Sequence, residues 1–195
     1  MRRGSALVAF ALAVFVTACG AIHPPAEPPP PAAPAWPGRL ACLQHPLIRA
    51  WERRLRTHPE LQETRQGLAR AARYLPGFRQ ILADRGVPPT FALLPLLESS
   101  FREDARGQLD ELGLWQLRTD TARRFGLTVN AGRDERLHPA RATGAAARYL
   151  HYLHARYRDW PLALAAYNAG EHRVDRALAP RPGASFWELA DGRHL

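Results

Sequence analysis

The sequence predicts a mainly α-helical protein with a single domain over residues 39–195. Most of residues 46–190 keeps apolar side chains three to four positions apart, and no long segment alternates as a half-buried strand does. Hydrophobic residues make up 46% of the chain and charged residues 23%, so the chain can bury a core. Its 195 residues, less an atypical N-terminal segment, leave room for one domain, and no internal repeat is visible.

The first 18 residues have the features of a secretory signal. Arg2 and Arg3 precede an apolar run over residues 6–16, which is too short to span a bilayer comfortably. The small residues before Cys19 resemble the lipobox of bacterial lipoproteins, in which this cysteine is lipidated and becomes the first mature residue. An ordinary signal peptide that happens to contain a cysteine is the alternative. We expect a lipoprotein signal peptide over residues 1–18 and lipidation of Cys19.

Residues 19–38 are expected to tether the domain to a membrane. Gly20 follows the cysteine, and in lipoproteins of Gram-negative bacteria this resemblance implies sorting to the outer membrane, with the domain on its periplasmic face. Several acyl chains make a stable anchor, whereas one chain binds only marginally. Residues 23–38 are proline-rich and favour extended polyproline II, which at about 3 Å per residue could span about 50 Å. Simple disorder would give a similar spacer, and a ligand for proline-binding modules is a third interpretation.

The charge is strongly positive, with 27 basic residues, all arginine, against 18 acidic ones and a net charge of +9. Such an excess suggests an anionic polymer as partner. Export argues against nucleic acid, so a carboxylate-rich cell wall or anionic lipid headgroups fit better; an arginine-rich genome would explain the same count. The two cysteines exclude a disulfide scaffold, and Cys42 is expected to be a small buried hydrophobe.

Apolar spacing and glycine or proline breaks place the helical segments along the chain. In order they cover residues 47–55, 61–75, 77–84, 91–100, 114–125, 142–157 and 162–169. The segment 142–157 has the clearest amphipathic pattern. Asp159 is expected to cap the last helix, with Pro161 in its first turn and Gly170 just past its end. Residues 102–112 are polar and predict a loop.

Glu98 stands out at the end of the apolar segment FALLPLLESS (residues 91–100). Such a segment is typical of a buried helix, and Pro95 either starts the regular helix late or kinks it. A carboxyl that ends this run is expected to face the interior or a cleft wall, where desolvation raises its pKa and lets it donate a proton near neutral pH. A position facing water at the helix end is the alternative, and the pattern alone does not decide between them.

Short motifs over roughly residues 74–177 resemble the lytic transglycosylases of the goose-type lysozyme superfamily, membrane-bound type D in particular. The motifs are LLP (93–95) then ESSF (98–101), GLWQ (113–116), RFGL (124–127), DER (134–136), and DW (159–160) then ALAAYNAG (163–170). Each motif alone is weak, but their order and spacing together are specific. The resemblance implies a mainly α, lysozyme-like (goose-type, SLT) catalytic domain with a sugar-binding cleft.

The resemblance also implies the chemistry, because Glu98 matches the family's only catalytic carboxylate. It would protonate the glycosidic oxygen between MurNAc and GlcNAc, while the substrate's N-acetyl group stabilises the cation at C1. The same carboxylate would then take the proton of the C6 hydroxyl as this oxygen closes onto C1. The product is a 1,6-anhydro-MurNAc end, made without water, cofactor or metal. Substrate-assisted cleavage of this kind needs no second carboxylate.

Four further residues match positions around the catalytic glutamate in the family. Ser99 is expected to support the glutamate, Gln116 to lie in the cleft near it, and Tyr167 to bring its hydroxyl close to it. With Asn168, these residues are expected to border or bind the glycan strands of peptidoglycan. A buried polar pair that joins two helices is the alternative for Tyr167 and Asn168.

The loop expected to line the cleft departs from the family pattern. The family's Asn-Pro falls at Arg102-Glu103, its serine at Gly107, its Gly-Ala at Asp110-Glu111, and its aromatic-Met/Ile-Pro at residues 117–119. Two alternatives therefore stay open besides the transglycosylase. One is a non-catalytic peptidoglycan-binding lipoprotein with a degenerate cleft. The other is a muramidase that uses water.

Other residue combinations do not predict a site. His151 and His154 are three apart on a helix but lack a third ligand, so zinc is not expected. The acidic residues between 103 and 111 do not have EF-hand spacing. No phosphate-binding glycine loop or Ser–His arrangement for nucleophilic catalysis is visible. Trp115 is expected in the core rather than as a platform for a sugar.

Overall fold

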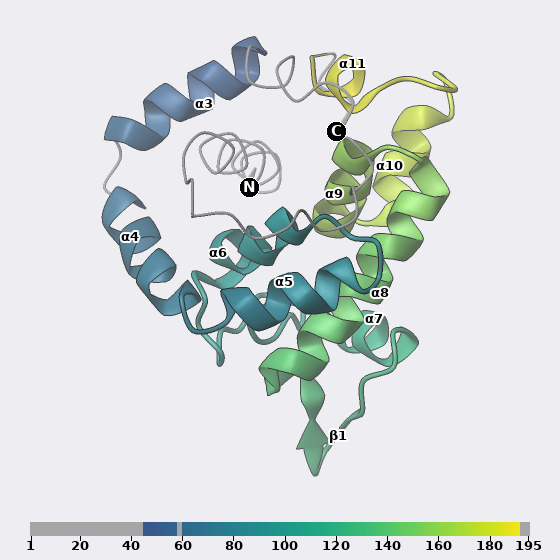
Figure 1. Ribbon diagram of the computed structural model, residues 1–195. Coiled ribbons are helices and arrows are strands. Elements are labelled where there is room, and N and C mark those ends of the chain that lie inside the picture. Colours follow the sequence, from purple (N-terminus) through teal and green to yellow (C-terminus); the bar gives the residue numbers. More distant parts are fainter. Residues whose placement is uncertain (1–44, 58–59, 192–195) are drawn as a thin grey trace, which may run out of the picture.

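A computed structural model describes residues 45–57 and 60–191 of the chain, and most of this part is helical (Figure 1). The prediction of a mainly α fold is therefore confirmed. The elements in chain order are α3 (Pro46–Thr57), α4 (Glu60–Ala71), α5 (Leu75–Ala83), the 3-10 helix η1 (Pro89–Leu93), α6 (Leu94–Ser99), α7 (Thr119–Arg124), β1 (Val129–Asn130), β2 (Arg133–Asp134), the 3-10 helix η2 (Glu135–Leu137), α8 (Pro139–Tyr157), α9 (Trp160–Ala169), α10 (Glu171–Leu178) and α11 (Phe186–Asp191).

The N-terminal predictions fall outside this part of the chain. The signal over residues 1–18, the lipidated Cys19, the linker over 19–38 and Cys42 all lie outside the described residues. They stay predictions. In the described part, no helix is both long and apolar enough to cross a membrane.

The long helix α8 is the central packing element, and α5 and α9 both pack against it (Figure 1). Small side chains let the helices approach closely, since Ala142 and residues 145–147 are at most 1% exposed. The helix α9 is buried over residues 161–166, which agrees with its nearly all-apolar sequence. Trp115 is fully buried, and its Nε1 donates a hydrogen bond to Thr143 Oγ1 at 2.8 Å. Trp115 is thus a core residue, as predicted.

The predicted cap of α9 is confirmed. Asp159 Oδ1 accepts a hydrogen bond from the Leu162 amide at 2.7 Å, and Pro161 lies in the first turn. Gly170, with φ +87°, ends the helix. This conformation is open to glycine because it has no Cβ.

Replacing Asp159 by alanine is expected to lower the free energy of unfolding by about 1 kcal/mol, because the Leu162 amide loses its partner. Urea unfolding followed by circular dichroism measures this change. Asp159→Asn is the matched control, since its side-chain oxygen can still accept the hydrogen bond. An equal loss in both variants would show that the cap is not the cause.

The segment predicted as one helix over residues 114–125 is helical only from Thr119 to Arg124, so that prediction was wrong at its start. Gly113 and Gln116 have φ +79° and +46°, in the left-handed region, so residues 113–116 form a turn. Leu112 and Leu117 then pair across this turn as an antiparallel bridge. A helix cannot run through residues in this conformation.

Two other boundaries differ from the prediction, and a short hairpin also forms. The segment expected over residues 61–75 ends at Ala71, and the next helix begins at Leu75. Residues 89–93 form the 3-10 helix η1, and Pro95 lies in the first turn of α6, so the proline starts the regular helix late rather than kinking it. The two-residue strands β1 and β2 form a small hairpin.

The face of α4 that meets the rest of the protein was not evident from its leucines. Leu61 and Leu68 are 38% and 46% exposed, whereas Gly67 and Ala71 are buried. Gly67 faces α6 so closely that a Cβ there would lie 2.5 Å from Leu96 Cδ1. Close approach of two helices selects small residues at the contact, so the leucines lie on the other face.

Candidate active site

Glu98 lies in the last turn of the short helix α6. This helix ends abruptly because Ser100 and Phe101 both adopt left-handed conformations, with φ 52° and 57°. Two such residues in succession are uncommon outside glycine, and conformations of this kind cost on the order of 1–3 kcal/mol each and cluster at functional sites. The buried Phe101 ring holds the turn against the core, and the Phe101 amide donates to the Pro95 carbonyl at 3.1 Å.

The helix α4 supports the same turn from outside. Arg70 Nε donates to the Ser100 carbonyl at 2.8 Å. Glu63 Oε1 accepts from Ser100 Oγ and from Arg102 Nη2, each at 3.3 Å. Together with the close contact at Gly67, these bonds fix the chain directly after Glu98.

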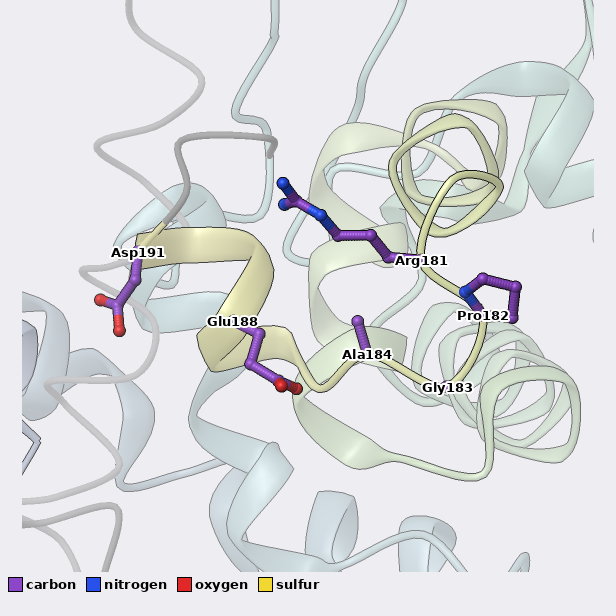
Figure 2. Close-up of a pocket in the computed structure, with 6 residues that line it drawn as sticks. All are labelled: Arg181, Pro182, Gly183, Ala184, Glu188 and Asp191. Carbon is purple, nitrogen blue, oxygen red and sulfur yellow. The ribbon is translucent and has the colours of Figure 1, made fainter.

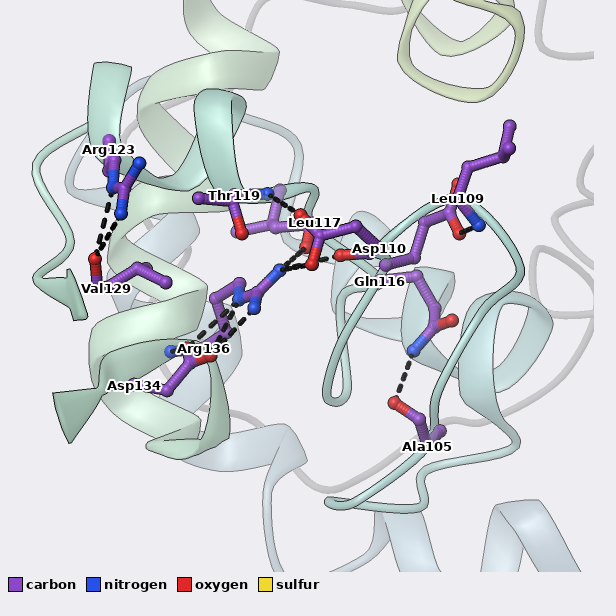
Figure 3. A network of polar contacts seen from close by, with 11 residues as sticks. Ala105, Leu109, Asp110, Gln116, Leu117, Thr119, Arg123, Val129, Asp134 and Arg136 are labelled. Carbon is purple, nitrogen blue, oxygen red and sulfur yellow. Dashed lines mark hydrogen bonds and ion pairs between the residues drawn. The ribbon is translucent and has the colours of Figure 1, made fainter. Parts of the chain in front are cut away.

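The GLWQ turn forms a wall beside α6, and three of the predicted site residues bind its backbone. Ser99 is 5% exposed, and its Oγ contacts the Leu114 carbonyl at 2.9 Å and the Pro95 carbonyl at 3.0 Å. Tyr167 from α9 donates its hydroxyl hydrogen to the Trp115 carbonyl at 2.8 Å. Gln116 Nε2 donates to the carbonyls of Gly113, at 2.7 Å, and Ala105, at 3.0 Å; Figure 3 shows the bond to Ala105.

The hydroxyl of Tyr167, which was expected close to Glu98, donates its hydrogen bond to the GLWQ turn. The two groups still interact electrostatically. Burial first, and the charge of Glu98 second, raise the pKa of Tyr167 well above its ordinary value. Tyr167 is therefore a neutral phenol that joins α9 to the GLWQ turn.

Asn168 follows Tyr167 on α9 and differs from it. Its side chain is half-buried and makes no hydrogen bond to any residue in the described part of the chain. The alternative of a polar pair that joins two helices fits neither residue, because Tyr167 joins α9 to the GLWQ turn and Asn168 bonds to none of the described residues.

The carboxyl of Glu98 has an unusual environment. It is half-buried, and no residue in the ranges 45–57 and 60–191 donates a hydrogen bond to it. Burial first, and the negative charge of Glu111 second, raise its pKa to about 7. The pKa values of Asp110 and Asp134 instead lie below the ordinary range, that of Asp110 because Thr119 donates to it and that of Asp134 because Arg136 does. Because the pKa of Glu98 lies near neutral pH while the pKa values of the two aspartates lie low, Glu98 is the candidate acid.

A pH-dependent stability follows from the raised pKa of Glu98. In the unfolded chain this carboxyl ionises near pH 4.5, but in the folded protein only near 7, so folding loses stability as the pH rises between these values. Glu98→Gln removes this loss and is expected to gain about 3 kcal/mol relative to the native protein at pH 8, and little at pH 4. Thermal unfolding of both proteins at the two pH values measures the difference. A constant difference between them would contradict the raised pKa.

Sequence analysis missed a network of polar contacts around Arg136, which holds the loop over residues 102–112 (Figure 3). Arg136 is 6% exposed, and its guanidinium binds Asp134 at 2.7 Å, the Asp110 carbonyl at 2.7 Å and the Leu117 carbonyl at 3.2 Å. Asp110 Oδ2 in turn accepts from the Thr119 amide at 3.0 Å. Two departures from the family pattern, Asp110 and Thr119, thus bind each other. In the sequence, the DER motif drew attention to Asp134 and Arg136. It did not indicate that Arg136 binds Asp110 and Leu117.

A separate hollow of about 640 Å³ lies near the C-terminal end of the described chain (Figure 2). Its lining residues are Arg181, Pro182, Gly183, Ala184, Glu188 and Asp191. None of the predicted site residues lines it. Among the described residues, no group of three or more His, Cys, Asp or Glu side chains is arranged to hold a metal ion.

A family model described as "Transglycosylase SLT domain" matches residues 78–190, which is more than half of the chain, so the chain belongs to this family. The supporting helix α4 precedes the matched region.

Two kinds of curated relatives are similar to this chain. Membrane-bound lytic murein transglycosylase D of Escherichia coli, in strain K12 and in strain O6:H1 CFT073, is 34% identical over 110 residues, 54% of this chain and 24% of the relative. A protein of Alteromonas sp. (strain M-1) named for tributyltin chloride resistance is 38% identical over 112 residues, 57% of this chain and 54% of the relative. The match thus spans about half or less of the length of these relatives.

Proposed function

We propose that this protein is a peptidoglycan lytic transglycosylase. It cleaves the β-1,4 bond between MurNAc and GlcNAc and leaves a 1,6-anhydro-MurNAc end. The observation that carries the proposal is Glu98, a half-buried carboxyl that receives no hydrogen bond from the described residues and whose pKa of about 7 suits proton transfer near neutral pH. Membership of the SLT family and the similarity to murein transglycosylase D support it.

In the first step the protonated Glu98 gives its proton to the glycosidic oxygen, and the bond from this oxygen to C1 of MurNAc breaks. The substrate's N-acetyl oxygen stabilises the positive charge that develops at C1. In the second step the C6 hydroxyl oxygen bonds to C1, and its proton returns to Glu98. No water is consumed, and the intramolecular hydroxyl has a large effective concentration. One carboxyl with a pKa near the working pH can serve as acid and then as base.

The surrounding residues divide into those that shape the site and those free to bind the glycan. Ser99 and Tyr167 use their hydroxyl hydrogens on backbone carbonyls, so they fix the wall that faces Glu98. Gln116 uses its amide hydrogens in the same way, which leaves its side-chain oxygen as an acceptor. The amide of Asn168 is not engaged by the described residues, so Asn168 is the strongest candidate for a direct hydrogen bond to the sugar.

The location proposed for the protein is the periplasmic face of the outer membrane. The lipobox-like sequence before Cys19 and the proline-rich linker over residues 19–38 support a lipid anchor and a spacer. The E. coli relatives are named as membrane-bound, which agrees with a location in the cell envelope.

Replacing Cys19 by alanine is expected to move the protein from the membrane fraction to the soluble fraction. Retention of this variant in the membrane would contradict lipidation.

Digestion of purified sacculi tests the proposed activity. The full-length protein, solubilised in mild detergent, is expected to release soluble muropeptides, with glycan strands as its partner and without an added cofactor. Sedimentation with sacculi in the absence of any release would instead support the non-catalytic peptidoglycan-binding lipoprotein. The departures in the loop over residues 102–111 would then explain the loss of activity.

A further inference from the structure

The two residues that depart from the family's Asn-Pro pattern both bind the segment that contains α4. Arg102 Nη2 lies 3.3 Å from Glu63 Oε1, which forms an ion pair between the loop and this helix. Glu103 Oε1 accepts a hydrogen bond from the Tyr74 hydroxyl and pairs with Arg73 Nη2 at 3.1 Å. All three partners precede the region that the family model matches, which begins at residue 78.

The residues between Glu98 and this pair are held from the same side. Arg70 is half-buried, and its Nε donates a hydrogen bond to the Ser100 carbonyl at 2.8 Å. The backbone of α4 also lies close to the turn, since a Cβ on Gly67 would lie 3.3 Å from the Ser100 carbonyl oxygen and 2.5 Å from Leu96 Cδ1. The chain that leaves Glu98 therefore contacts α4 through both side chains and backbone.

Tyr74 adds a packing contact at the next residue of the turn. It is buried, and its ring stacks on that of Phe101, with the ring centroids 5.9 Å apart. Ser100 and Phe101 both have left-handed backbone conformations. Strained conformations of this kind persist only where the surrounding structure holds them. The contacts from α4 and Tyr74 supply that support.

We propose that Arg70 is a positioning residue for Glu98, and that α4 belongs to the active site although it lies outside the region matched by the family model. This inference rests on the proposed function, in which the Glu98 carboxyl must reach the glycosidic oxygen and then the C6 hydroxyl. No described residue donates a hydrogen bond to this carboxyl, so the backbone that carries it sets its position. A displacement of about 1 Å at a reacting group can lower a rate by about 10²-fold.

Arg70→Met tests the proposal, because methionine keeps an unbranched side chain but cannot donate to the Ser100 carbonyl. In the full-length protein, we expect kcat for muropeptide release to fall about 10-fold and KM for sacculi to stay within about twofold, since Arg70 contacts the turn and not the glycan. The backbone amides of Phe101 and Arg102 are bonded within the turn. Their hydrogen exchange, followed by NMR, is expected to become faster.

Arg65→Met is the matched control, since Arg65 is an exposed arginine on the same helix and its replacement removes the same charge. It is expected to keep the native kcat and the native exchange rates. If Arg70→Met does not fold, Glu63→Ala takes its place, because Glu63 is exposed and its carboxylate binds both Ser100 and Arg102.

A native kcat in the folded Arg70 or Glu63 variant, or an equal fall of kcat in Arg65→Met, overturns the proposal. If the native protein itself releases no muropeptides, the proposed activity fails, and hydrogen exchange then decides the role of Arg70. Faster exchange of the two amides in Arg70→Met supports its hold on the turn, and unchanged exchange overturns it.

Discussion

Glu98→Gln is expected to lower the rate of muropeptide release by about 10³-fold or more, because glutamine can neither donate nor accept the transferred proton. No other residue in the described part of the chain combines a raised carboxyl pKa with a place beside the GLWQ turn. The fold is expected to persist, since no hydrogen bond within the described residues depends on the Glu98 carboxyl. Chromatography of the products released from sacculi measures the rate, and thermal unfolding checks the fold.

Glu188→Gln is the control for this experiment. Glu188 is an exposed glutamate on α11 that binds Ser185, and none of the site residues contacts it. It is expected to keep the native rate. Substantial release by Glu98→Gln would show that the proton comes from another group and would remove Glu98 from the mechanism.

Gly113→Ala is expected to lower the free energy of unfolding by about 3 to 5 kcal/mol. Gly113 has φ +79°, which disfavours any residue with a Cβ. A Cβ there would also lie 2.4 Å from the Arg136 carbonyl oxygen, which is backbone and cannot move aside cheaply. Because Gly113 begins the turn that Ser99 and Tyr167 hold, activity is expected to fall as well. Urea unfolding measures the change in stability.

Gly86→Ala separates the two causes. Gly86 also has a positive φ, at +68°, but nothing lies within 4 Å of a Cβ at this position. This variant is expected to lose about 1–2 kcal/mol, the conformational cost alone. Equal losses in the two variants would show that the close approach to Arg136 is not important.

Helices with a clear periodic pattern could be predicted from the sequence, as α8 and the cap at Asp159 show. The start of the segment at residue 114 could not, because left-handed residues such as Gln116 leave no apolar period. The packing face of α4 was hidden for a related reason. A glycine that permits close approach, Gly67, decides the contact, whereas the spacing of leucines draws attention to the exposed face.

The candidate site shows the same division. Glu98 was evident as a carboxylate at the end of an apolar run, and the motifs pointed to Ser99, Gln116 and Tyr167. Their partners are backbone carbonyls of the GLWQ turn, which no side-chain pattern reveals. The departures at Gly107 and Glu111 looked independent in the sequence. Only the fold shows that one makes room for the other.

The most direct test of the central claim is digestion of sacculi in ¹⁸O-labelled water, followed by mass analysis of the muropeptides. If Glu98 takes the proton of the C6 hydroxyl as this oxygen bonds to C1, the products are one water lighter than hydrolysed muropeptides and carry no ¹⁸O. Products of hydrolysed mass that contain ¹⁸O would contradict this account and identify the protein as a muramidase that uses water.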